Sequence, residues 1–367
     1  MATTFKTFSS NDITSTRTLL HEAIPITGTL VSGTYGTYPT GTHIKDHSHG
    51  MYQSVYDYPY LSSSANHIFD ITFGYASASA LSGAASKQNS KKINIYNTFA
   101  QVLNGVDVTG NVKPFKLPGG NPIYEALFLT FSRLLVKDEI KKGSFSLTLA
   151  TGSVFRGANF FTELKQYTDN NAQNSFYTDS PAGEYAIITA SHIAGAAAGV
   201  RGDAADVGVD SAGSGLLYYQ AGVLVLSASH DQVRIMTGSN ATIGGRTDDG
   251  SKVGTFLMFA SGSNISSSTN AFRHRIQEVS FNNTTELNST IHFCRASHND
   301  FNYSANPTYL SESRIRVKNS SLDQPVSYIT SVGLYSSDNE LLAVAKLSEP
   351  IKKSPDTELT MRVRLDY

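Results

Sequence analysis

Histidines gather at one place in the chain, where His47 and His49 follow Asp46 and stand close to His43. Histidines two residues apart on a strand point to the same face, and imidazole is a common ligand of zinc. A zinc site needs further ligands, however, and none follows at a recognisable spacing. We therefore interpret these side chains as hydrogen-bonded loop histidines, and the sequence predicts no metal and no cofactor.

Other short motifs that can carry chemistry are equally incomplete. The stretch Gly244–Gly250 fits neither a P-loop nor a dinucleotide-binding fingerprint, so a surface turn is the default interpretation. Arg201–Asp203 spells an adhesion tripeptide, but three such residues in a Gly/Ala-rich stretch occur often by chance. Asp138 and Glu139 lie among lysines, as at a solvated helix end. No nucleophile elbow is present, so we assign no catalytic residue and predict that the chain is not an enzyme.

Charged residues are scarce in this chain. They make up 16% of it, whereas a typical soluble domain carries nearer a quarter. The 29 Lys and Arg against 30 Asp and Glu leave no positive excess for phosphate, so nucleic acid is not a predicted partner. Ser, Thr, Asn and Gly replace the missing charge, which suits close contact with other polypeptides. The 19 Tyr fit an interface and a strand-rich fold equally well.

The cysteine count and the hydropathy of the chain limit which disulfides, signal peptides and membrane spans can be expected. Cys294 is the single cysteine, so no intrachain disulfide is possible, and a small buried side chain is its favoured role. The first residues show no positive segment followed by an apolar run, so no signal peptide is expected. No stretch approaches the ~18 apolar residues that a membrane span needs.

The last forty residues show the clearest structural pattern. Apolar and polar residues alternate strictly from Glu358 to Tyr367, which predicts a strand with one apolar face. Tyr328–Tyr335 and Leu341–Ser348 are two further predicted strands, and turn formers at Ser336–Asn339 and Pro350–Asp356 separate the three. We predict a three-stranded meander that ties this end of the chain into a sheet, its own or that of a neighbour.

Helical spacing predicts three helices upstream. A short one is expected at Ser15–Ala23, a second at Lys91–Leu103 ending near Gly105, and a longer one at Tyr124–Ile140.

Strand patterns occur throughout the rest of the chain. Alternation predicts strands at His67–Tyr75 and Ser144–Ala150, and the apolar run Leu216–Ser227 predicts another with a bend at Gly222. Beyond residue 255 the chain is rich in strand formers, and Asn282 and Asn283 are expected in a turn.

These elements predict a β-rich α+β fold. The predicted organisation is an extended N-terminal arm over residues 1–60, an α+β domain with two helices on a sheet over 61–190, a flexible Gly/Ala-rich loop over 191–215, and an antiparallel, sandwich-like β domain over 216–367.

Six long stretches of the chain carry a further signal: residues 14–30, 49–70, 131–149, 278–296, 301–310 and 328–367. Together they resemble virion structural proteins of tailed bacteriophages, in particular those of contractile-tailed myophages of marine cyanobacteria and related bacteria. The resemblance implies a structural subunit of the particle, assembled in the host cytoplasm, with other virion proteins or further copies of itself as partners. It implies no catalytic residue.

An α+β, β-rich chain of this size without repeats fits the tail baseplate or the neck better than the shell lattice or a long fibre, and the baseplate is the leading expectation. A neck or head–tail connector protein, or a host-surface adhesion module, are the alternatives. The N-terminal segment and the last strand are the expected contacts with partners, because backbone pairing at a strand edge gives affinity. The candidate partner-binding residues are Leu19, Leu20, Ile24, Leu359, Met361, Val363, Leu365 and Tyr367.

Overall fold

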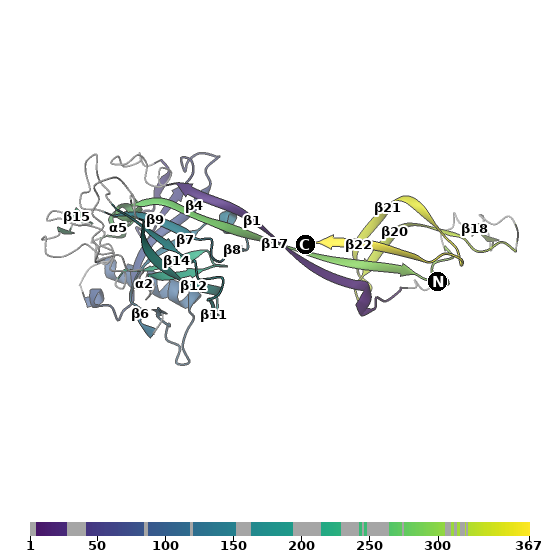
Figure 1. The fold of residues 1–367 in the computed structure, drawn as a ribbon, viewed down its shortest axis with the longest axis horizontal. Helices are drawn as coiled ribbons and strands as arrows, with labels where there is room; N and C mark the ends of the chain where they lie inside the picture. Colours follow the sequence, from purple (N-terminus) through teal and green to yellow (C-terminus); the bar gives the residue numbers. More distant parts are fainter. Residues whose placement is uncertain are drawn as a thin grey trace. The chain divides into compact units, whose positions relative to one another are not determined.

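The chain forms two compact units in the computed structural model (Figure 1). Unit 1 comprises Met1–Leu20 and Glu286–Tyr367, and unit 2 comprises His21–Thr285. These bounds differ from the predicted ranges because strands β1 and β17 pair with each other and each contributes residues to both units. The structure describes residues 5–27, 42–83, 87–117, 120–151, 163–193, 214–228, 242–243, 246–247, 264–273, 275–304, 310–311, 314–315, 320 and 322–367.

A large antiparallel sheet dominates the strand pairing, and it confirms the predicted β-rich α+β class. Its central path runs β1-β17-β9-β10-β12-β13-β14-β7-β4-β3-β2. The bounds of these strands are β1 Ile13–Thr27, β2 Ile44–Asp46, β3 Gln53–Tyr56, β4 His67–Tyr75, β7 Glu125–Phe131, β9 Ser146–Thr151, β10 Glu163–Thr168, β12 Gly183–Ile193, β13 Gly215–Tyr218, β14 Val223–Ser227 and β17 Ile276–Ala296.

Shorter elements complete the structure. Helix α2 packs along β4, and the described helices include none that is long and apolar enough to cross a membrane. The remaining elements of unit 2 are η2 Ala80–Gly83, α2 Lys87–Leu103, β5 Phe115–Lys116, β6 Pro122–Ile123, α3 Arg133–Val136, β8 Glu139–Ile140, β11 Tyr177–Ser180, β15 Thr242–Ile243, β16 Arg246–Thr247 and α5 Ile265–Arg273.

The core of unit 2 lies on both faces of the sheet, as strand β7 shows. Its residues alternate between two buried clusters: Leu127 and Leu129 belong to one, and Ala126 and Phe128 belong to the other. On the second face Phe99 of α2 stacks on Phe128 with ring centroids 4.3 Å apart. A strand that is covered on both faces reads as a continuous apolar run rather than as an alternating one.

The helix predicted over Tyr124–Ile140 was therefore wrong. The range contains strand β7, the single helical turn α3 and the short strand β8. Every position of residues 126–131 except Thr130 is apolar, so helical spacing is satisfied by default. Such a run cannot be told from a buried helix by periodicity alone.

The helix predicted at Ser15–Ala23 was also wrong, because these residues belong to strand β1. Residues with β-branched side chains, which favour strands, stand on both sides of the Leu19–Leu20 pair. They are Thr14, Thr16 and Thr18 before it, and Ile24 and Ile26 after it. The predicted N-terminal arm thus contains a long strand, and it also contains β2 and β3.

The turn predicted at Asn282 and Asn283 does not exist, since both lie inside β17. The Asn283 side chain explains its place there: its Nδ2 donates to the backbone oxygen of Leu135, and its Oδ1 accepts the backbone N–H of Glu22. Strong turn formers can stay extended when neighbouring strands satisfy their polar groups.

Other predicted elements are confirmed. The helix expected at Lys91–Leu103 is α2, the strand at His67–Tyr75 is β4, and that at Ser144–Ala150 is β9 with shifted ends. The run Leu216–Ser227 is two strands, β13 and β14, in which Gly222 closes the hairpin with φ of 64°. Residues 194–213 of the predicted loop, which include Arg201–Asp203, lie outside the described residues, as do Gly244, Gly245 and residues 248–250.

Unit 1 contains the C-terminal strands but not the predicted meander. Strands β20 and β21 form an antiparallel hairpin, as expected. Strand β22 pairs with β17 rather than with β21. The elements that lie entirely in this unit are η1 Ser10–Asp12, β18 Leu310–Ser311, β19 Arg314–Ile315, β20 Ser327–Tyr335, β21 Leu341–Lys353 and β22 Leu359–Asp366.

Candidate assembly surface

The last strand is paired with its own chain. β22 forms an antiparallel ladder with β17 that runs from Ala296 opposite Leu359 to Ser289 opposite Asp366. Tyr367 extends this ladder, since its backbone N–H donates to the Asn288 oxygen at 2.9 Å. One edge of β22 is therefore filled within the molecule, and its partner strand precedes it by some seventy residues of sequence.

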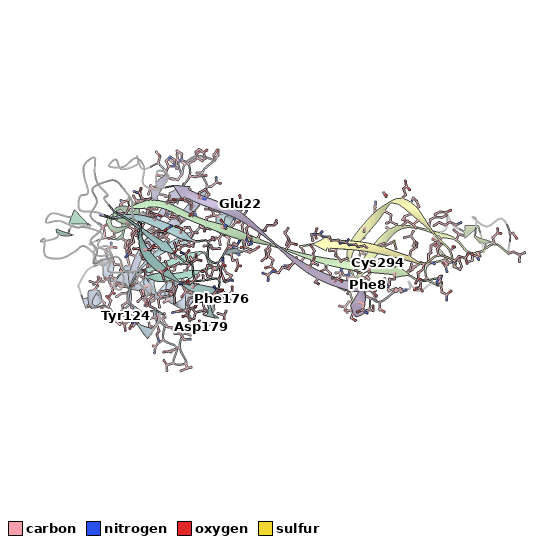
Figure 2. The ribbon with its side chains drawn as sticks, viewed as in Figure 1. Phe8, Glu22, Tyr124, Phe176, Asp179 and Cys294 are labelled. Carbon is pink, nitrogen blue, oxygen red and sulfur yellow. The ribbon has the colours of Figure 1, made fainter. Side chains whose placement is uncertain are left out.

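The predicted alternation of β22 is visible in its burial. Val363 is buried, Leu359, Met361 and Leu365 are half-buried, and Tyr367 is exposed. Cys294, labelled in Figure 2, lies opposite Met361 and is itself half-buried, which raises the pKa of its thiol. The apolar face of β22 thus lies against its own unit, and Tyr367 is the predicted contact residue of this strand that presents most of its surface.

The predicted contact residues of β1 divide between the two units. Leu19 and Leu20, in unit 1, are about half exposed. Ile24, in unit 2, is half-buried and packs against the larger core cluster. Of the predicted N-terminal contacts, Leu19 and Leu20 are therefore the two that remain available to a partner.

The segment before β1 is bound to unit 1 at several points. Lys6 pairs with the Asp300 carboxylate and donates to Ser297 Oγ at 3.0 Å. The Phe8 ring lies 5.3 Å from the His292 ring of β17. Figure 2 labels Phe8 close to Cys294, another residue of β17. These contacts order the segment that the sequence predicted to be an extended arm.

A buried lysine braces the end of the β20–β21 hairpin. The Lys353 ammonium donates to the backbone oxygens of His298 and Ser354 at 3.2 and 2.9 Å and to Asn302 Oδ1 at 2.8 Å. The residue is completely buried. A buried ammonium persists only where acceptors replace its water, and here three oxygens do so.

Apolar burial is very different in the two units. In the described part of unit 1 the only buried apolar residues are Ala296, Leu334 and Val363, whereas unit 2 has two large buried clusters. Large apolar side chains of unit 1 are instead exposed, at positions Phe5, Phe8, Ile13, Leu19, Leu20, Leu287, Phe301, Tyr303, Leu322, Tyr328, Tyr335, Leu341, Leu342, Val344 and Tyr367. Exposed apolar residues become a candidate interaction surface where they adjoin one another.

Four of these residues adjoin one another and form what we call the hairpin patch: Phe5, Tyr335, Leu341 and Val344. The Phe5 and Tyr335 rings lie 4.8 Å apart, and Tyr335 stands opposite Leu341 in the ladder. Val344 stands opposite Gly333 in the ladder. The side chains of Tyr335 and Leu341 both lie next to Gly333. The sequence predicted both strands but not this surface, because a strand pattern does not show which face the rest of the chain covers.

The histidine cluster of unit 2 is a hydrogen-bonded network. The His47 and His49 rings stack 5.1 Å apart, and His47 Nε2 lies 3.1 Å from Ser54 Oγ. Ser54 Oγ and His67 Nε2 both donate to Asp70 Oδ1, at 2.5 and 2.9 Å. Burial lowers the pKa of His47, and the nearby His49 adds to this effect. The described residues include no group of three or more side chains that can hold a metal.

Comparisons with known proteins add no relative, because no protein-family model, curated protein or solved structure matches this chain.

Proposed function

We propose that this chain is a structural subunit of a bacteriophage virion, placed in the tail baseplate, whose work is to dock neighbouring subunits. The observation that supports the docking role is the apolar surface of unit 1, whose described residues include three buried apolar side chains and many exposed ones. The phage assignment comes from the likeness of the six stretches named above to virion structural proteins. The proposed role is non-enzymatic: the energy of subunit contact does the work.

Unit 2 supports this role by supplying the stable part of the subunit. Its sheet is covered on both faces, and it buries nearly all of the apolar core. The described residues of unit 1 include only three buried apolar side chains, whereas a domain of this size ordinarily relies on a continuous core. A surface of this kind is expected where a subunit becomes complete only in its assembly.

Particles purified on a density gradient test this proposal. We expect mass spectrometry to detect the chain in the particles and an antibody against unit 2 to label the baseplate in electron micrographs. Label at the neck or at the distal tip would replace the baseplate assignment with the connector or adhesion alternative. Absence of the chain from washed particles, with the protein present in the soluble lysate, would refute a virion role.

A variant identifies the surface that is used. Leu19→Asp together with Leu20→Asp places two charges on half-exposed residues of unit 1, and we expect it to reduce incorporation into particles. Val108→Asp is the matched control, because Val108 is fully exposed but lies in unit 2. Equal incorporation of both variants would remove Leu19 and Leu20 from the docking surface.

A further inference from the structure

We propose that the turn between β2 and β3, residues 47–52, is a pH-sensitive latch that is closed at neutral pH and opens in weak acid. Protonation of His47 and His49 is the trigger. The latch goes beyond the proposed docking role, because it lies wholly within unit 2 and needs no partner.

One hydrogen bond of the turn requires a neutral imidazole. The backbone N–H of Met51 donates to Nδ1 of His49 at 3.0 Å. A ring nitrogen accepts a hydrogen bond only when it carries no proton, and in the imidazolium ion both ring nitrogens are donors. Protonation of His49 therefore replaces this bond with two N–H groups that point at each other.

The neighbouring histidine makes the charged state less favourable still. The His47 and His49 rings stack almost parallel, with centroids 5.1 Å apart and planes at 4°. The Tyr52 ring lies against both, with centroid distances of 4.5 and 5.0 Å. Two neutral rings gain from this contact, whereas two imidazolium ions at the same distance repel each other. Burial, followed by the charge of His49, lowers the pKa of His47 accordingly.

Among the described residues, the charged groups around the turn leave no negative surplus to receive these protons. Two carboxylates act on His47, those of Asp46 and of Asp70 in β4. The second is shared, because Nε2 of His67 lies 2.9 Å from its Oδ1 and forms an ion pair with it once protonated. The cations near the turn are Lys45 of β2, Lys91 of α2, and Arg273 of α5, which donates to Gln53. Protonation of both histidines thus leaves the turn with excess positive charge.

Hydrogen bonds to two other elements hold the turn closed. Nζ of Lys91 in α2 donates to the backbone oxygen of His49 at 2.6 Å. Oγ1 of Thr72 in β4 donates to the backbone oxygen of Met51 at 2.5 Å. A short turn held by few bonds opens locally at low free energy, so the loss of the bond to His49 releases residues 47–52 while β2 and β3 stay paired.

Hydrogen–deuterium exchange of the purified full-length chain tests the proposal. Mass spectrometry follows peptides that cover residues 44–56, and the rates are corrected for the intrinsic effect of pH on amide exchange. We expect corrected exchange in this segment to be about tenfold faster at pH 5 than at pH 7.5. Exchange in the core strand β7 should be the same at both pH values, and it also confirms that each variant is folded.

Substitutions of one histidine identify the trigger. His49→Asn keeps a side-chain oxygen that can accept the Met51 N–H, as in an Asx turn, but gains no proton in this range. It should stay protected at both pH values. His49→Lys carries a charge at both and should exchange rapidly at both. His298→Asn is the matched control, because His298 is an exposed histidine of unit 1, and it should keep the wild-type response.

Equal corrected exchange of the wild-type turn at the two pH values would overturn the proposal. So would a pH response in His49→Asn as large as that of the wild type, because the trigger would then lie elsewhere. Neither measurement involves particles, so the latch and the virion role can fail separately.

Discussion

The carboxylate of Asp12 accepts a hydrogen bond from Nε of Arg295 at 2.6 Å, which joins the segment before β1 to β17 within unit 1. The same carboxylate accepts Ser9 Oγ at 2.6 Å and the Ser9 backbone N–H at 3.0 Å. Three donors thus converge on one acid.

These contacts predict a specific loss of stability in acid. The Ser9 hydrogen bonds, followed by that of Arg295, lower the pKa of Asp12 from 3.8 to about 2. A lowered carboxyl pKa stabilises the fold above pH 3.8, and the contribution disappears as the pH falls towards 2. We expect Asp12→Asn to lower unfolding stability at pH 7 but to match the wild type near pH 2, as measured by urea unfolding across pH. Asp338→Asn, at an exposed turn of the same unit, is the control.

A buried carboxylate organises one corner of unit 2. Asp169 accepts the Gly143 backbone N–H and the Tyr219 hydroxyl at 2.8 Å on one oxygen, and the Phe145 N–H at 2.9 Å on the other. Burial raises the pKa of Asp169 while these bonds oppose the rise. Asp169→Ala leaves all three donors without an acceptor, so we expect a loss of about 3–5 kcal/mol in unfolding free energy.

The matched comparison is Tyr219→Phe, which removes only one of the three bonds and should cost about 1 kcal/mol. Chemical denaturation monitored by tyrosine fluorescence measures both. Equal losses for the two variants would show that the backbone donors find other acceptors.

Helix α2 and strand β4 meet at a glycine. A Cβ at Gly74 would lie 2.8 Å from the Lys92 carbonyl oxygen and 2.9 Å from the Tyr96 nitrogen, which are backbone atoms of the helix. Gly74→Ala must push the helix away from the sheet, so we expect a destabilisation of about 1–3 kcal/mol in thermal unfolding. Gly83→Ala, which meets no atom within 4 Å, should be neutral. A neutral Gly74→Ala would mean that α2 can shift without loss of packing.

Lys353 and its neighbour Lys352 form a natural pair for a second test in unit 1. Lys353→Met leaves three oxygens in a buried site without their hydrogen-bond donor. We expect a loss of about 1–3 kcal/mol in unfolding free energy and faster hydrogen exchange of the β20 and β22 amides. Lys352 is exposed, so Lys352→Met should leave this exchange unchanged. Equal exchange in both variants would contradict a bracing role for the buried ammonium.

The strands of this protein show which part of a fold a sequence can predict. The alternation of β22 predicted its strand and its inner face, and helix α2 was predicted from its spacing. The partner of β22 was not predictable, because β17 lies far away in the sequence and period-two patterns do not specify a neighbour. The same limit explains Asn283 of β17, whose side-chain partners at Leu135 of α3 and Glu22 of β1 become visible only once the three elements are placed together.

The candidate surface was predictable only in part. Leu19, Leu20 and Tyr367 are exposed, as a contact role requires, whereas Val363 packs inside unit 1. A sequence pattern shows that a strand has an apolar face but not whether the same chain covers it. For β22 its own unit covers that face, while Leu341, Leu342 and Val344 of β21 remain exposed.

The division of unit 1 into two sequence segments has a consequence for synthesis. The ribosome delivers Met1–Leu20 first, and the strands that hold this segment emerge only after all of unit 2 has been translated. Closing so long a loop costs entropy, but a folded unit 2 already holds His21 within 3.2 Å of Thr284 at the two ends of that loop. A folded unit 2 can thus bring the two sequence segments of unit 1 together before they pair. Mutations that slow the folding of unit 2 should therefore delay the folding of unit 1, even though they lie outside it.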